Sequence, residues 1–181
     1  MAIQISSDGR TFTLQTEKSS YQMMADAHDV LLHLYYGRKI AAENLEERIF
    51  RSDVGFAGNP PEAGEDRTYS LDVLPQELPG SGVGDYREDM VRLYHADGSC
   101  AADFRFESYE VQEGAYRIPG LPAAYDTGEE KGETLVITMR ETASAVKVKL
   151  YYGVFEKENV ITRTVCIENQ GKEAVILDKA L

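Results

Sequence analysis

Three consecutive side chains, Asp85-Tyr86-Arg87, bring together a carboxylate, an aromatic ring and a guanidinium. Carboxylates and guanidinium groups hydrogen-bond to hydroxyls, and an aromatic face stacks on a sugar ring. The three residues follow a glycine-rich run, Gly80 to Gly84, which permits backbone conformations that other residues avoid. A structural function competes with sugar contact, because Asp85 can cap a turn and Arg87 can hold the loop or a partner surface through a bidentate ion pair. We favour the structural or interface function, with direct sugar contact as the alternative.

Other catalytic and cofactor-binding patterns are missing from the sequence. The three histidines have no zinc-type spacing to Cys100 or Cys166, and no Gly-x-Ser-x-Gly nucleophile elbow occurs. The run from Gly80 to Gly84 superficially resembles a phosphate-binding loop, but it lacks the lysine and a convincing helix after it. We therefore assign no catalytic residue and expect no metal, nucleotide or other cofactor.

Alternation of apolar and polar residues predicts the strands that must position these side chains. The alternation is clearest from Val146 to Val154, where every second residue faces one side of a pleated strand. Similar runs occur at residues 12–14, 135–139, 161–167 and 175–177. The gaps between the later runs suit hairpins and are too short for crossover helices. We expect a mostly β chain, an antiparallel β-sandwich (supersandwich) with one or two short helices.

Two segments before the Asp85 loop need separate interpretation. Apolar residues at helical spacing predict a helix from Ile40 to Phe50, whereas β-branched and aromatic residues favour a strand from Val30 to Tyr36. Between Arg51 and Arg67 the chain is polar and rich in glycine and proline, which predicts a long connection. The stretch from Tyr69 to Arg87 begins like a strand and then becomes a loop, since its two prolines exclude a helix or a central strand.

Composition limits the class of protein and its partners. The chain has 181 residues, enough for a single domain with a substantial core, and a formal net charge of −12. This charge repels nucleic acids and anionic lipid surfaces, and no apolar run approaches the roughly 20 residues of a membrane helix. We expect neither nucleic acid nor membrane as a partner. The first ten residues lack the apolar core of a secretory signal and both cysteines are interpreted as reduced thiols, which together predict a cytoplasmic protein.

Several separated motifs occur in a family-specific order. They are Pro75-Gln-Glu77 leading to Gly84-Asp-Tyr-Arg87, Asp103-Phe-Arg-Phe-Glu-Ser-Tyr-Glu110, Gly120-Leu-Pro-Ala-Ala-Tyr125, Val160-Ile-Thr-Arg-Thr-Val165 and Asn169-Gln-Gly171. Over most of residues 20–181 the chain resembles the amino-terminal domain of glycoside hydrolase family 36, the retaining α-galactosidases (melibiases). Motifs that recur in order are more specific than any single one. Residues 1–22 offer no motif that matches.

The resemblance implies that residues 1–181 are the amino-terminal β-sandwich domain of a longer glycosidase, with a catalytic (β/α)8 barrel expected after Leu181 and absent here. The full enzyme would release terminal α-linked galactose from oligosaccharides such as raffinose and melibiose by double displacement. That reaction needs two carboxyl groups about 5 Å apart, and the family carries both on the barrel. We therefore expect this chain to be non-catalytic and inactive alone, supporting the barrel, oligomer contacts and the sugar entrance.

The resemblance also implies partners: the chain's own barrel, further copies in a homo-oligomer, and α-galactoside oligosaccharides. In the family, the long connection extends towards the active-site mouth of a neighbouring subunit, and its counterparts here are Asp53, Phe56 and Arg67. A plainer alternative is that Asp53 and Arg67 only solvate a loop. A free-standing carbohydrate-binding β-sandwich without catalysis is the alternative function. The strand-like sequence of residues 173–181 favours a chain that continues in a longer protein.

Overall fold

Tight turns join the strands of the first sheet, an antiparallel meander in chain order. Its strands are β1 (Ile3–Ile5), β2 (Thr11–Gln15), β3 (Ser19–Ala25) and β4 (Leu31–Arg38). Gly9, between β1 and β2, has a φ of 71°, a left-handed conformation that glycine adopts without strain. Strand β4 covers nearly all of the segment from Val30 to Tyr36, so the strand predicted there is confirmed.

The second main sheet is also an antiparallel meander, of strands β6, β7, β8 and β9. These strands are β6 (Phe104–Glu113), β7 (Glu133–Glu141), β8 (Val146–Phe155) and β9 (Val160–Asn169). The predicted hairpins are present from β7 to β9. A separate small sheet pairs β5 (Val91–Tyr94) with β10 (Ile176–Ala180). The structure is a computed structural model that describes residues 2–55, 59–126 and 131–181.

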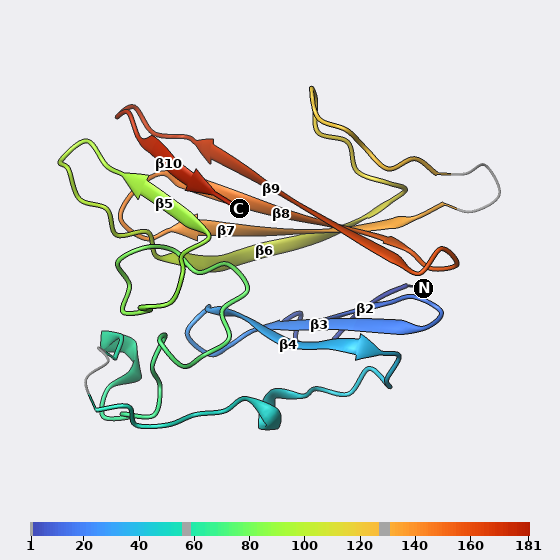
Figure 1. The fold of residues 1–181 in the computed structure, drawn as a ribbon, viewed down its shortest axis with the longest axis horizontal. Coiled ribbons are helices and arrows are strands. Elements are labelled where there is room, and N and C mark those ends of the chain that lie inside the picture. Colours follow the sequence, from blue (N-terminus) through green and yellow to red (C-terminus); the bar gives the residue numbers. More distant parts are fainter. Residues whose placement is uncertain (1, 56–58, 127–130) are drawn as a thin grey trace.

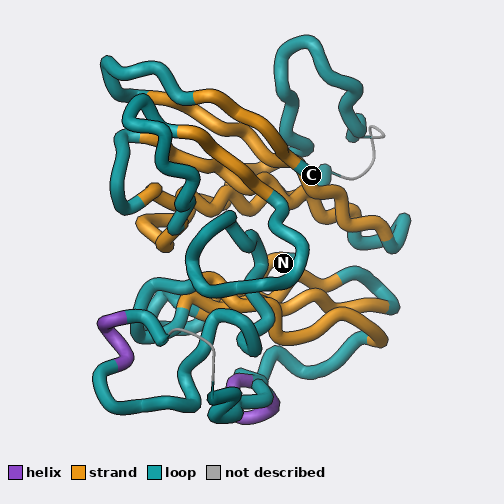
Figure 2. The backbone as a smooth tube through the Cα atoms, turned by 60° about the vertical axis from the view of Figure 1, so that its left-hand side comes forward, coloured by secondary structure: helices purple, strands orange, loops and turns teal. Residues whose placement is uncertain are grey.

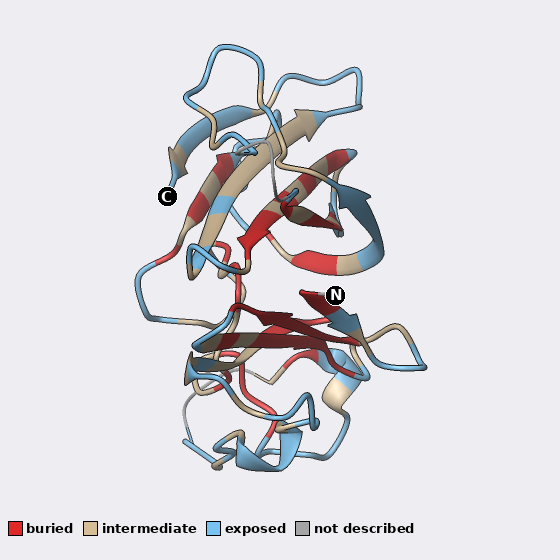
Figure 3. Ribbon diagram, turned by 90° about the vertical axis from the view of Figure 1, so that its right-hand side faces the viewer, coloured by how far each residue is buried: buried red, intermediate tan, exposed pale blue. Residues whose placement is uncertain are grey.

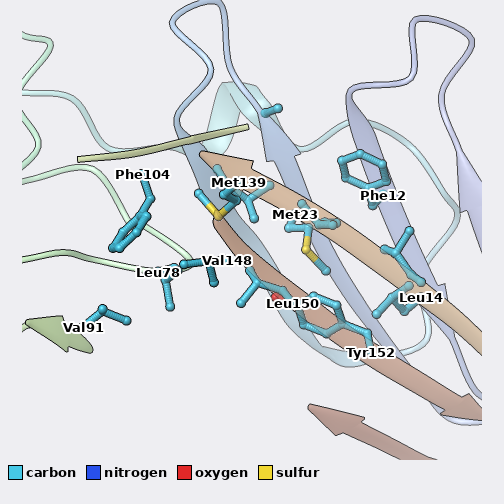
Figure 4. Close-up of a cluster of buried hydrophobic side chains, with 14 of the residues drawn as sticks. Phe12, Leu14, Met23, Leu78, Val91, Phe104, Met139, Val148, Leu150 and Tyr152 are labelled. Carbon is cyan, nitrogen blue, oxygen red and sulfur yellow. The ribbon is translucent and has the colours of Figure 1, made fainter. Parts of the chain in front are cut away.

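The two four-stranded sheets form the layers of a sandwich (Figures 1 and 2). The main core lies between them, where side chains from β2 and β3 point towards those of β7 and β8 (Figure 4). Its members labelled in Figure 4 are Phe12, Leu14, Met23, Leu78, Val91, Phe104, Met139, Val148, Leu150 and Tyr152. The predicted mostly β, antiparallel sandwich is therefore confirmed.

The two central strands of the first sheet, β2 and β3, are largely buried on both faces. All five residues of β2 are buried (Figure 3), because residues 39–55 and 59–74 run across the face that points away from the second sheet (Figure 1). In the described part of this crossing, the only regular elements are two single-turn 3-10 helices, η1 (Glu46–Arg48) and η2 (Pro61–Ala63). Across the described residues, no helix is long and apolar enough to cross a membrane.

The helix predicted from Ile40 to Phe50 is wrong, because only η1 forms there. The side chain of Gln22 on β3 donates to the carbonyl of Glu43 at 2.8 Å and accepts from the amide of Leu45 at 3.1 Å. These bonds hold the segment in an irregular path along the sheet. Tertiary contacts thus override a modest helical propensity.

The strand-like start of the Tyr69 segment is also wrong. The amides of Val73 and Leu74 both donate to the carbonyl of Ser70 at 3.0 Å, which closes a turn. The buried side chains of this turn pack on the outer face of β3 and β4. They form a second apolar cluster of Met24, Val30, Leu32, Tyr69, Leu71 and Leu74. The apolar residues that suggested a strand therefore serve to fasten the loop to the sheet.

Candidate functional site

Asp85 and Arg87 form a bidentate ion pair. Arg87 Nε and Nη2 each lie 2.8 Å from a different carboxylate oxygen of Asp85. Arg87 Nη2 also donates to the carbonyls of Leu71 at 2.9 Å and Leu74 at 2.7 Å. Burial raises the pKa of Asp85, but the hydrogen bonds from Arg87 outweigh it and leave that pKa below its usual value. The pair therefore fastens residues 85–87 to the turn that packs on the sheet.

The Tyr86 side chain takes no part in this ion pair and is 77% exposed. Its backbone amide donates to Asp72 Oδ1 at 2.8 Å, so the backbone is fixed while the ring remains free. An exposed aromatic face on a held loop has the chemistry to stack on a sugar ring. Of the three predicted residues, two hold the loop and one presents a ring to solvent.

Asp53 and Arg67 meet at the surface, although they are 14 positions apart in the sequence. Arg67 Nε lies 2.8 Å and Nη2 3.2 Å from the two carboxylate oxygens of Asp53. The hydrogen bond from Arg67 is the main cause that lowers the pKa of Asp53. Phe56, the third residue predicted on this connection, lies outside the described residues. The connection thus presents one exposed, charge-balanced pair that can hydrogen-bond to hydroxyl groups.

Glu77 is a buried carboxylate that the sequence did not single out. Its side chain is 3% exposed. The hydroxyls of Tyr21 on β3 and Tyr152 on β8 each donate to it at 2.7 Å. Arg163 Nε on β9 lies 3.5 Å from Oε1, and His33 Nδ1 on β4 lies 3.4 Å from Oε2. Glu77 therefore joins both sheets from the loop that carries Asp85.

The electrostatics of this cluster favour an ionised Glu77. Burial raises the pKa of Glu77, but the contact with His33, the charge of Arg163 and the tyrosine hydrogen bonds together leave it below its usual value. Burial, reinforced by the charge of Glu77, raises the pKa of both Tyr21 and Tyr152, so these hydroxyls remain donors. The cluster is thus a satisfied ionic centre, and its chemistry is structural.

The sequence contained one sign that Glu77 is buried, because this acidic residue belongs to the Pro75-Gln-Glu77 motif and has apolar residues on both sides of that motif. Nothing in the sequence named its partners. His33 extends the cluster to the surface, where it lines a hollow of about 250 Å³ together with Arg48 and Phe50. Among the described residues, no three His, Cys, Asp or Glu side chains gather as metal ligands, and both Cys100 and Cys166 are free.

The sequence matches the family described as "Glycosyl hydrolase family 36 N-terminal domain" over residues 29–181. It is 44% identical over 180 residues to the bifunctional α-galactosidase/sucrose kinase AgaSK of Mediterraneibacter gnavus, covering 99% of this chain and 19% of that protein. It is 34% identical to the α-galactosidase AgaA of Geobacillus stearothermophilus, covering 100% of this chain and 25% of that protein. The chain therefore spans a quarter or less of the length of these relatives.

Solved structures agree with the sequence matches. The galactosidase domain of AgaSK superimposes with a TM-score of 0.94, covering 99% of this chain and 25% of that one. The α-galactosidase AgaB from Geobacillus stearothermophilus superimposes with a TM-score of 0.90 at 35% identity, covering 100% of this chain and 24% of that one. The chain accordingly belongs to the glycosyl hydrolase family 36 N-terminal domain family.

Proposed function

We propose that this chain is the non-catalytic amino-terminal domain of a retaining α-galactosidase and shapes the entrance to its galactoside site. The observation that carries the proposal is the match of nearly the whole chain to one quarter of the AgaSK galactosidase domain, at a TM-score of 0.94. The barrel, with its two catalytic carboxylates, would follow residue 181. Relatives named α-galactosidase AgaA have been solved with raffinose and with stachyose, and we propose the same class of substrate.

An exposed apolar surface supports packing against the barrel. Ile176 on β10 pairs with Tyr94 on β5, and these side chains are 66% and 38% exposed. Leu177 and Leu181 are 49% and 65% exposed on the same strand and just beyond it. Ile176 and Tyr94 lie on one face of this small sheet and Leu177 on the other, since successive side chains of a strand alternate. Exposed apolar side chains such as these are typical of surfaces that another domain or subunit covers. We also propose contacts between copies in a homo-oligomer, and a cytoplasmic location in keeping with the two free thiols.

The connection with Asp53 and Arg67 is our candidate for the sugar entrance. Both side chains are exposed and offer hydrogen-bond donors and acceptors. The experiment joins this chain to the catalytic part of the AgaSK galactosidase domain and measures kcat and KM for raffinose. We expect Asp53→Ala or Arg67→Ala to raise KM about threefold or more with kcat nearly unchanged. Glu65→Ala, an exposed residue of the same connection, is the matched control. Equal KM values for all three variants would contradict the proposal.

The chain alone tests the non-catalytic part of the proposal. We expect no hydrolysis of p-nitrophenyl α-galactoside above a mock-purified control, because the two carboxyl groups of the retaining reaction would lie on the barrel. Reproducible turnover by the purified 181-residue chain would contradict this.

A second candidate function, sugar binding by the isolated domain, is favoured by the exposed ring of Tyr86. The test is a calorimetric titration of the chain with galactose, melibiose and raffinose. Saturable binding that is lost in Tyr86→Ala, and kept in Tyr36→Ala, supports this function. Tyr36 is a suitable control because its side chain is 68% exposed on β4. No binding up to millimolar sugar supports a site that the barrel completes.

A further inference from the structure

Tyr69 contacts both ends of the connection that carries Asp53 and Arg67. The guanidinium carbon of Arg51, where the connection begins, lies 5.7 Å from the centroid of the Tyr69 ring. Tyr69 itself lies two residues after Arg67, just beyond the other end of the connection, and is 2% exposed. A cation facing an aromatic ring at this distance is attracted to it. One buried ring therefore holds the two ends of a surface connection together.

The same ring fastens the connection to the first sheet. The Tyr69 hydroxyl donates to Asp26 Oδ2 at 2.6 Å, and Asp26 is 3% exposed directly after β3. The other oxygen, Asp26 Oδ1, accepts from the amides of His28 at 2.9 Å and Val30 at 3.0 Å, which shapes the turn between β3 and β4. A buried carboxylate is stable only with its oxygens satisfied. The Tyr69 hydroxyl thus satisfies the remaining carboxylate oxygen of Asp26, whose other oxygen is already held by the turn between β3 and β4.

Hydrogen bonds inside the connection shape its two described arms, residues 51–55 and 59–68. The amide of Gly55 donates to Asp53 Oδ1 and the amide of Thr68 to Asp66 Oδ1, each at 2.9 Å. All hydrogen bonds made by the residues of these two arms join them to each other or to Tyr69. The link between Tyr69 and Asp26 is therefore the hydrogen bond that ties this unit to the sheet.

The hydroxyl of Tyr69 is suited to a permanent link. Burial raises the pKa of Tyr69, and the hydrogen bond to Asp26 raises it further. The hydroxyl consequently stays protonated and donates its hydrogen bond throughout the neutral pH range.

We propose that Tyr69, acting with Asp26 and Arg51, is the positioning residue that holds Asp53 and Arg67 in place at the galactoside entrance. The inference rests on the proposed function of the connection. Tyr69 contacts no sugar and acts only through the two arms that it fastens. Its loss should therefore loosen Asp53 and Arg67 while leaving the sandwich folded.

The first test measures amide hydrogen exchange in the 181-residue chain by NMR. In Tyr69→Phe, the amides of Gly55 and Thr68 should exchange about tenfold faster or more, since one hydrogen bond to a carboxylate is lost. Tyr21→Phe is the matched control, because it removes a hydroxyl that donates to a different buried carboxylate, Glu77. It should leave these two amides within twofold of the parent. Equal exchange in both variants would overturn the inference.

A second variant guards against misfolding of Tyr69→Phe. Arg51→Met removes the cation from the ring face and leaves the buried hydrogen bond intact. We expect faster exchange of the Gly55 amide in this variant. No change in that exchange rate would count against the clamp, by which we mean the contacts through which Tyr69, Asp26 and Arg51 hold the connection.

The functional test uses the chain joined to the AgaSK catalytic part. Tyr69→Phe should raise KM for raffinose about threefold with kcat within twofold, and should add nothing in an Asp53→Ala background. If Asp53→Ala leaves KM unchanged, the proposed function fails, although exchange can still reveal the clamp. If Asp53→Ala raises KM and Tyr69→Phe does not, the proposed function stands and Tyr69 is not its positioning residue.

Discussion

Replacement of Glu77 by glutamine should weaken the domain more than any surface substitution. Glutamine keeps the shape of the side chain but removes the negative charge, and so leaves Arg163 without its counter-ion. It also replaces one carboxylate oxygen by an amide nitrogen, which can only donate, and so removes the acceptor that Oε2 offers to Tyr21 and His33. The change therefore tests whether an ionised Glu77 holds the two sheets together.

The expected magnitude follows from burial. Removing one partner of a buried ion pair costs about 3–5 kcal/mol. The value here should be near the lower end, because the side chains of Arg163 and His33 are 28% and 35% exposed and can regain water. We expect the free energy of unfolding to fall by about 3 kcal/mol. At roughly 2–4 °C per kcal/mol for a domain of this size, the midpoint of thermal unfolding should fall by roughly 6–12 °C.

Urea unfolding measures this change directly. The chain has 11 tyrosines and no tryptophan, so tyrosine fluorescence and far-UV circular dichroism report the transition. Glu156→Gln is the control, because Glu156 lies 3.9 Å from Lys39 with both side chains 41% exposed. Such exposed pairs contribute roughly 0–1 kcal/mol. The slope m should not change, so that the midpoint reports stability alone.

A double-mutant cycle separates the pair from its surroundings. In the background Arg163→Met, loss of the Glu77 charge should cost at least about 1 kcal/mol less than in the parent, because the two groups are in contact. Two results would refute the reasoning: a loss from Glu77→Gln no larger than that from Glu156→Gln, or fully additive effects of the two substitutions at Glu77 and Arg163.

Three further predictions follow from the same structure. The pKa of Glu77 in the folded domain lies below its ordinary value of 4.5, so the stabilisation by the ionised carboxylate is complete above pH 4.5 and is lost as the pH falls through the lower folded value. The urea midpoint of the parent should therefore fall more steeply in acid than that of Glu77→Gln. Parallel curves for the two proteins would contradict this. Arg87→Lys cannot keep the bidentate pair with Asp85, so the free energy of unfolding measured by urea titration should fall by about 1–2 kcal/mol. An unchanged urea midpoint would show that the pair contributes nothing to stability. A Cβ on Gly80 would lie 1.8 Å from the carbonyl oxygen of Ala102; Gly80→Ala should cost about 2 kcal/mol or more in the same assay, and parent-like stability would mean that the two segments can separate freely.

Sequence patterns predicted the strands well and the irregular segments poorly. Alternation from Val146 to Val154 corresponds to β8, where buried and half-buried residues alternate over the first seven positions. Helical spacing from Ile40 to Phe50 failed, because Gln22 binds that segment's backbone groups in an irregular path. The strand signal at Tyr69 failed for a related reason, since its apolar residues pack on the sheet from a turn. Local patterns report burial more reliably than they report the backbone path.

The candidate residues were predicted in part. The sequence predicted a turn cap for Asp85 and a bidentate ion pair for Arg87 without naming the partner of Arg87, and the structure shows that this partner is Asp85. Asp53 and Arg67 are 14 positions apart. The sequence predicted both as candidate residues but did not predict that they contact each other. Glu77 appeared only as part of a motif, and the clamp at Tyr69 did not appear at all.

The sequence by itself determined the family, the mostly β composition and the strand-forming segments, because these depend on residue types within short windows. The tertiary structure alone decided the function of the buried polar groups. Glu77 finds its tyrosine partners 56 and 75 residues away in the chain, and Tyr69 finds Asp26 at a separation of 43. A buried carboxylate is stabilised by whichever donors the packed sheets bring to it, and no local pattern records which distant donors those will be.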